Sequence, residues 1–236
     1  MSTYVLIHGA GGTAWQWHLV TARLEALGHD VVVPELPVDD DAAGLAEYAD
    51  AVVDAIADRR DRLILVAQSM AGFTAPLVAE RVPSELLVLV AAMVPAPGES
   101  PGAWWADTGH AEARAAMAAR LGPGYDPDDQ VATFLHDVPA ALVAESADHL
   151  RRQSGTPFAA PWPLDAWPDV PTRFLLCRDD RFFPADFQRR LARGRLGIEA
   201  DEMPGGHLPA LSHPEELVRR LEGYRAAVES GTRLAR

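Results

Sequence analysis

Three polar positions of this chain follow expected strands, and their residue types suit nucleophilic catalysis. Ser69 stands in VAQSMAG, between an apolar run and a helical pattern. Asp179 and Asp180 follow the run TRFLLC, and His207 follows two glycines after the last expected strand. A serine hydroxyl needs a histidine to take its proton and a carboxylate to orient that histidine. Ser, acid, His is one of the chain orders in which such triads occur.

The segment around Ser69 is a weak signal when it is taken alone. A sharp turn from strand to helix strains the serine backbone and lifts the hydroxyl above the carboxyl edge of the sheet, where open α/β sheets bind ligands. The residues that flank such a serine must be small, and here they are Ala67 and Ala71 instead of the usual glycines, with Gly72 next. The other interpretation is a serine that caps a helix. The downstream acids and histidine favour catalysis.

The other candidate residues have structural interpretations that compete with catalysis. His207 could be a surface loop residue, but a Gly-Gly-His turn directly after a strand is what a mobile, solvent-facing imidazole requires, which favours catalysis. Either aspartate could instead cap the helix that is expected to begin near Pro184. His29, His149 and His213 are interpreted as ordinary surface or helix-end residues, and their spacing matches no metal site.

The glycine-rich loop LIHGAGGTAWQW is interpreted as part of an oxyanion hole. A tetrahedral oxyanion needs backbone N–H donors, and small residues allow them to face a ligand. We expect the N–H groups of Ala10 and Met70 to form this hole. The rival interpretation is a dinucleotide site, with Glu35 as the ribose-binding carboxylate. It is weak because GAGGTA lacks the Gly-x-Gly-x-x-Gly order.

The elements that must position these residues alternate between short apolar runs and amphipathic stretches. This alternation predicts an α/β fold, a mostly parallel sheet flanked by helices. Strands are expected at 4–8, 30–35, 62–67, 86–92, 172–177 and 198–203, and helices at 17–28, 44–60, 185–197 and 214–229, with a further helical pattern after Ser69. Residues 95–171 interrupt the alternation and are expected to form a helical cap, with helices near 110–121 and 128–153, inside a single domain.

Composition limits the classes of function. The chain has 236 residues and a formal net charge of −13, which disfavours binding to nucleic acid or anionic membranes. It contains no lysine, so Schiff-base chemistry and a P-loop are excluded. A single cysteine forms no internal disulfide. Neither a signal peptide nor a membrane span is expected, so a cytoplasmic location is predicted.

With these residues in place, the chain resembles small α/β-hydrolases, in particular the group of plant methyl esterases, hydroxynitrile lyases and their bacterial relatives. HGAGGTAW and DDRFFPADFQ are the more specific matching segments. The resemblance implies that Ser69 is the nucleophile, His207 the base and Asp180 the acid, with Asp179 as the fallback.

Two departures from that group distinguish among its activities. The similar lyases have a threonine after the histidine of the first loop and a lysine after the catalytic histidine, where this chain has Gly9 and Leu208. Loss of the cation favours ester hydrolysis over cyanohydrin cleavage. Leu208 and the tryptophans of the cap, Trp105 among them, suggest an apolar pocket, although the aromatic residues could equally form the core of the cap.

The sequence therefore predicts a serine carboxylesterase that hydrolyses small to medium, largely apolar esters through an acyl-enzyme. Its expected partner is a small-molecule ester, with no metal or organic cofactor. A homodimer is left open. The alternatives are lactonase or lyase chemistry at the same residues, or a non-catalytic receptor for a small ligand.

Overall fold

The computed structural model describes residues 1–59 and 62–231. Within these residues six parallel strands form one sheet in the order β2-β1-β3-β4-β5-β6. This arrangement confirms the predicted α/β class. The strands are β1 (Thr3–Ile7), β2 (Asp30–Val32), β3 (Leu63–Gln68), β4 (Leu86–Val90), β5 (Thr172–Cys177) and β6 (Asp201–Met203).

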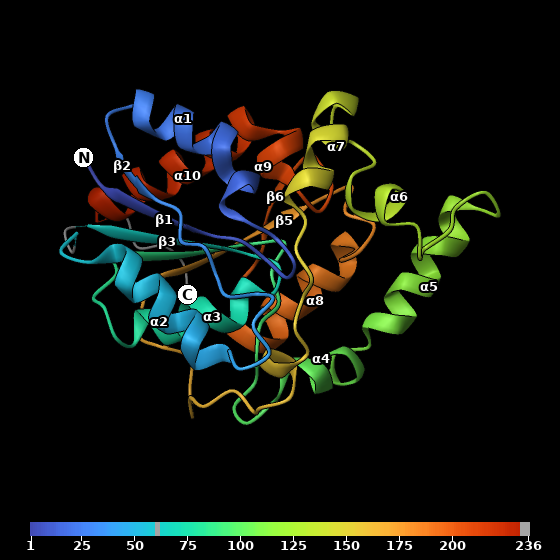
Figure 1. Cartoon of the computed structure of the whole chain (residues 1–236), viewed down its shortest axis with the longest axis horizontal. Helices are drawn as coiled ribbons and strands as arrows, with labels where there is room; N and C mark the ends of the chain where they lie inside the picture. The colour runs from blue at the N-terminus through green and yellow to red at the C-terminus, as the bar shows by residue number, and fades with distance from the viewer. Residues whose placement is uncertain (60–61, 232–236) are drawn as a thin grey trace.

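Helices cover both faces of the sheet (Figure 1). Successive residues of a strand point to opposite faces, so the continuous apolar runs supply a core to each layer. Val5 and Ile7 pack with α2 (Leu45–Ile56), α3 (Ala71–Ala79) and α8 (Ala185–Leu196), whereas Tyr4 and Leu6 pack with α1 (His18–Ala26) and α10 (Pro214–Glu229).

The predicted helices of the main layers form, with shifted ends. The stretch expected at 17–28 divides into a 3-10 helix, η1 (Ala14–Trp17), and α1. The helix expected at 44–60 ends at Ile56, and its expected last residue, Arg60, lies outside the described residues. β2 and β6 are shorter than expected.

The chain between β4 and β5 is largely helical, and we use the name cap segment for residues 95–171. The helix expected at 110–121 is observed, but a single helix at 128–153 is wrong. Pro139 interrupts it, because a proline disfavours helical geometry in the residue before it. The cap segment contains α4 (Pro101–Asp107), α5 (His110–Leu121), α6 (Gln130–Phe134), α7 (Ala140–Ser146), η2 (Ala147–His149) and η3 (Thr156–Phe158).

A close approach between two backbones determines the turn from β3 into α3. Ser69 has φ 55°, a left-handed conformation that is uncommon for any residue with a side chain. Its carbonyl oxygen accepts hydrogen bonds from the N–H groups of Gly72 (3.1 Å) and Met93 (2.9 Å). A Cβ atom on Gly72 would lie 1.9 Å from the carbonyl oxygen of Met93. The residue that this turn requires to be glycine is therefore Gly72, and Ala67 and Ala71 are tolerated beside it.

Substitution of Gly72 should reverse the usual effect of replacing a helical glycine by alanine. Gly72→Ala is expected to lower the free energy of unfolding by about 1–3 kcal/mol, because the added methyl group overlaps backbone. Gly223→Ala in α10 is the matched control, since nothing lies within 4 Å of its added Cβ. That change should stabilise by about 0.5–1 kcal/mol. Urea unfolding measures both values, and equal values for the two variants would contradict the prediction.

Candidate active site

The structure brings Ser69, His207 and Asp180 together at the carboxyl edge of the sheet. The Nε2 atom of His207 lies 3.0 Å from the Oγ atom of Ser69, and its Nδ1 atom lies 2.8 Å from Oδ2 of Asp180. The three residues follow β3, β5 and β6, parallel strands of one sheet that end at the same edge. All three are buried. A carboxylate at Nδ1 leaves Nε2 free to accept the proton of the serine hydroxyl.

Asp180, and not its neighbour Asp179, contacts the imidazole. The Oδ1 atom of Asp180 accepts hydrogen bonds from the N–H groups of Phe182 (2.8 Å) and Phe183 (2.9 Å), which leaves Oδ2 for His207. Asp179 instead accepts a hydrogen bond from the N–H of Gly205, at 3.1 Å. Asp180 thus orients the ring, while Asp179 ties down the turn that leads to it.

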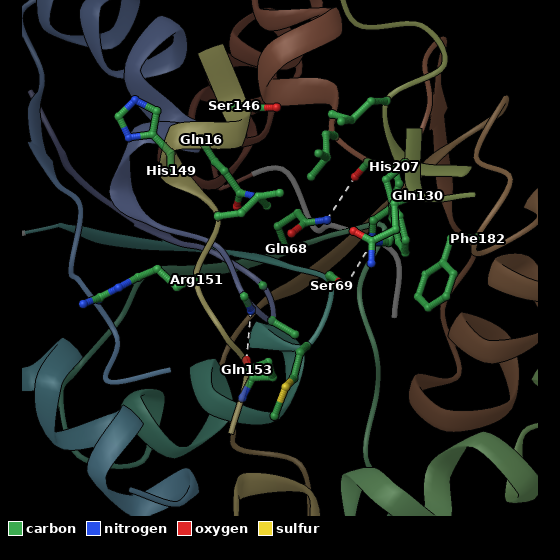
Figure 2. Close-up of a pocket in the computed structure, with 18 of the residues that line it drawn as sticks. Gln16, Gln68, Ser69, Gln130, Ser146, His149, Arg151, Gln153, Phe182 and His207 are labelled. Atoms are coloured by element: carbon green, nitrogen blue, oxygen red, sulfur yellow. Dashed lines mark hydrogen bonds between the residues drawn. The ribbon is translucent and has the colours of Figure 1, made fainter. Parts of the chain in front are cut away.

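His207 is not the solvent-facing residue expected from its glycine turn. The residue is 3 % exposed, because the rings of Phe134, Phe182 and Phe183 surround the imidazole at centroid distances of 5.4, 5.2 and 5.0 Å. Its carbonyl oxygen accepts a hydrogen bond from Nε2 of Gln68, at 3.0 Å (Figure 2). The ring is therefore fixed by packing as well as by Asp180.

The loop of residues 9–12 and the start of α3 bring Ala10 and Met70 to the same cavity as Ser69. Within the described ranges, the structure records no protein acceptor for the N–H of either residue. Gly9 lies tightly against Ser69, since a Cβ atom at position 9 would be 2.9 Å from the Cβ of Ser69 and 2.7 Å from Oε1 of Gln68. Glu35, the expected ribose-binding carboxylate of the dinucleotide interpretation, instead accepts a hydrogen bond from the N–H of Ala14, at 3.0 Å.

A cavity of about 430 Å³ opens above Ser69 (Figure 2). Gly9, Trp105 and Leu208, the predicted pocket residues, all line it. Trp104 and Trp162 are instead buried in the core. The aromatic and aliphatic part of the lining is completed by residues that include Trp15, Met70, Met93, Phe134, Leu135, Phe158, Phe182 and Leu211.

Several residues of the site escaped sequence analysis. His149 was interpreted as a surface residue, but it lines the cavity and stacks on Trp15 with ring centroids 4.6 Å apart. Gln68 could have been recognised because it directly precedes the nucleophile. Phe134 and Gln153 lie in the cap segment, where no motif relates sequence position to the site.

His110 supports the aromatic wall beside His207. It is buried against Phe182 and Phe183, and its Nε2–H donates to the carbonyl oxygen of Phe182, at 2.9 Å. Burial lowers the pKa of His110 from 6.5 to about 4, and the hydrogen bond to the carbonyl offsets this only in part. The imidazole is therefore neutral at neutral pH and serves as a packed, hydrogen-bonded ring.

Among the described residues, no group of three or more His, Cys, Asp or Glu side chains is arranged to hold a metal ion. No helix in the described part of the chain has the length and apolarity needed to cross a membrane.

A nucleophile turn, a buried His-Asp pair and a glycine-rich loop at one edge of a parallel sheet define the α/β-hydrolase class. The chain belongs to the alpha/beta hydrolase family, whose model matches residues 4–220. Within it, the chain falls in the methylesterase-like group. It is 28 % identical to Methylesterase 7 of Arabidopsis thaliana over 91 % of this chain and 92 % of that protein.

Other relatives have different activities in their names. A pyrethroid hydrolase of Sphingobium wenxiniae is 25 % identical over 93 % of this chain and 86 % of its own length. The crystal structure of polyneuridine aldehyde esterase superposes with a TM-score of 0.79 at 20 % identity and covers 95 % of this chain and 99 % of its own. That structural likeness shows the fold.

The two neighbouring aspartates should differ sharply when each is changed to asparagine. Asp180→Asn is expected to slow labelling of Ser69 by a fluorophosphonate roughly 10³–10⁴-fold, because the amide no longer holds the imidazole in its reactive tautomer. Asp179→Asn retains an oxygen for the Gly205 N–H and should label at nearly the native rate. Comparable losses in both variants would contradict the assignment of Asp180.

His110 should make the protein less stable in acid. The pKa of His110 is 6.5 in the unfolded chain and about 4 in the folded chain, so between these two pH values only the unfolded chain binds a proton at this residue. The free energy of unfolding therefore falls as the pH falls through this range. From pH 7 to pH 5 the loss is about 2 kcal/mol. His110→Gln keeps an N–H donor and should remove this part of the pH dependence, as measured by urea unfolding. Parallel curves for the two proteins would contradict the prediction.

Proposed function

We propose that this protein is a serine carboxylesterase that hydrolyses small to medium, largely apolar esters through an acyl-enzyme. The observation that carries the proposal is the continuous hydrogen-bonded chain from Ser69 Oγ to His207 (3.0 Å) and from His207 to Asp180 (2.8 Å). The similarity to Methylesterase 7 along most of both chains supports ester chemistry.

In the acylation step, Ser69 Oγ attacks the ester carbonyl while Nε2 of His207 takes the hydroxyl proton. The carbonyl oxygen becomes an oxyanion, which the N–H groups of Ala10 and Met70 stabilise. His207 then gives its proton to the leaving alkoxide, and the alcohol departs. Asp180 holds the imidazolium while it is charged.

In the deacylation step, a water molecule takes the place of the alcohol. His207 removes a proton from the water, and the oxygen attacks the acyl carbon to form a second oxyanion in the same hole. Collapse of this intermediate transfers the proton to Ser69 Oγ and releases the acid. No cofactor takes part in either step.

The lining of the cavity supports an apolar substrate. Phe134 and Phe182 flank His207, and Trp105 contacts Phe182 with ring centroids 5.8 Å apart. Because the departing alcohol must receive its proton from His207, these rings lie where they would contact the substrate near its ester oxygen. The cavity of about 430 Å³ suits a small-molecule ester.

Cyanohydrin cleavage lacks the groups that the similar lyases provide. The chain has no lysine, and Leu208 lines the cavity at the position of the lyase lysine. A threonine side chain at position 9 would begin within 3 Å of Gln68 and Ser69. The residues at positions 9 and 208 therefore favour ester hydrolysis over cyanohydrin cleavage.

Ester hydrolysis should depend entirely on Ser69. Ser69→Ala is expected to lower kcat for p-nitrophenyl acetate by about 10⁴-fold or more, because the nucleophile and its base act as a unit. The absorbance of the released p-nitrophenolate gives the steady-state rates. After treatment with a fluorophosphonate, intact-protein mass spectrometry should show the phosphonyl adduct in the native protein and not in Ser69→Ala. Native-rate hydrolysis by Ser69→Ala would overturn the proposal.

The same preparation separates the alternatives. Lactones and mandelonitrile are assayed beside the esters, and we expect ester turnover to dominate. Dominant cyanide release would indicate a lyase, and dominant lactone opening a lactonase. A native protein that neither labels nor turns over esters but binds a small ligand tightly would be a receptor.

A further inference from the structure

The oxyanion loop (residues 9–12) is held by a segment of the cap that we call the strap (residues 150–154). Both backbone groups of Gly11 bind it. The N–H of Gly11 donates to Oε1 of Gln153 at 2.9 Å, and its carbonyl oxygen accepts from the N–H of Arg151 at 3.0 Å. Figure 2 shows Gln153 directed at the loop beside the cavity. The cap and the loop are thus joined by a pair of hydrogen bonds next to the expected oxyanion hole.

The strap is itself anchored to the main domain. Nε2 of Gln153 donates to the hydroxyl of Tyr48 (3.0 Å) and to the carbonyl oxygen of Ser154 (2.9 Å). The N–H of Ser154 donates to the carbonyl oxygen of Val38, at 2.7 Å. Tyr48 is buried in α2. The amide of Gln153 therefore connects Gly11 to the core through a side chain that is fully hydrogen-bonded.

Apart from the strap, the contacts that hold Ala10 are local, and one of them is the hydrogen bond from the N–H of Gly12 to the carbonyl oxygen of Gly9, at 3.3 Å. Ala10 is exposed and lies between glycines in the sequence HGAGG, and glycine has the largest conformational freedom of any residue. On one side, Nδ1–H of His8 binds the carbonyl oxygen of Gly9, at 3.0 Å. On the other side, Gly11 has φ 63° and depends on the strap. An oxyanion hole stabilises charge only if its donors are fixed before the reaction.

We propose that Gln153 is a positioning residue for the oxyanion hole. It acts through Gly11 to orient the N–H of Ala10, so that the hole is complete only when the strap is seated on the loop. This inference rests on the proposed function. It makes the cap a working part of the catalytic centre as well as the wall of its cavity.

Substitutions at Gln153 separate the acceptor from the bulk of the side chain. Gln153→Met keeps the length of the side chain but removes the oxygen that Gly11 binds. It is expected to lower kcat for p-nitrophenyl acetate about tenfold or more, with KM changed less than about threefold. The expected loss is smaller than the roughly 10²–10³-fold effect of removing an oxyanion donor, because the N–H of Ala10 is displaced and not deleted. Gln153→Glu keeps an acceptor for Gly11 and should retain more turnover than Gln153→Met, with some loss because its carboxylate cannot donate to the carbonyl oxygen of Ser154. Arg193→Ala, at an exposed residue of α8 whose ion pair is with Glu199, is the control outside the strap and should stay within about twofold of native.

Two further measurements distinguish positioning from loss of structure. A trifluoromethyl ketone forms a hemiketal oxyanion with Ser69, so its inhibition constant should rise in Gln153→Met by the factor by which kcat/KM falls. Hydrogen exchange of peptides that cover residues 8–14 should be faster in Gln153→Met than in the native protein and Gln153→Glu. Thermal unfolding of each variant establishes that it is folded.

The outcomes separate the two proposals. Native kcat or unchanged exchange of the loop in folded Gln153→Met would overturn the role of Gln153. If the native protein hydrolyses no ester but Gln153→Met still shows faster exchange, the link between strap and loop stands and the proposed function fails.

Discussion

The site depends on the close approach of two backbones at Ser69. The carbonyl oxygen of this residue binds Gly72 and Met93 at once, which couples the start of α3 to the chain that leaves β4. Such a contact leaves no room for a side chain at position 72 and holds Ser69 at a positive φ. Backbone strain of this kind persists only where the surrounding structure over-determines it. Here buried strands on both sides of β3 supply that support.

The parallel sheet then brings the remaining groups to the hydroxyl. β5 and β6 end at the same edge as β3, so Asp180 and His207 need only short turns to reach Ser69. Each turn is fixed by hydrogen bonds to backbone, from Phe182 and Phe183 to Asp180 and from Gln68 to the carbonyl oxygen of His207. Burial strengthens these contacts because little water competes for them.

Sequence patterns predicted the sheet and the three residues at its edge because both follow from local rules. Apolar runs mark strands, and polar residues just after them lie at the edge that binds ligands. The burial of His207 does not follow from local sequence, because part of its cover comes from Phe134, which is 73 positions away along the chain. The secondary structure of the cap segment is the part that the sequence predicts least well. Its helices are short and do not pack on a repeating strand pattern, although Pro139 is a local signal for the break in the helix expected at 128–153.

The proposed catalytic groups therefore differ in what holds them. Ser69, His207 and Asp180 are buried and are supported by the sheet edge, which the hydrophobic core makes rigid. Ala10 is exposed, in a loop that glycines make flexible, and the sheet cannot fix it. The core of the domain can preorganise the proposed nucleophile, whereas the proposed oxyanion donor on this loop is held by a local hydrogen bond from Gly12 to Gly9 and by contacts from outside the loop. The proposed role of the strap is to supply such a contact through Gly11, which gives a physical reason for an esterase of this kind to build its substrate cover and its oxyanion hole from one hydrogen-bonded unit.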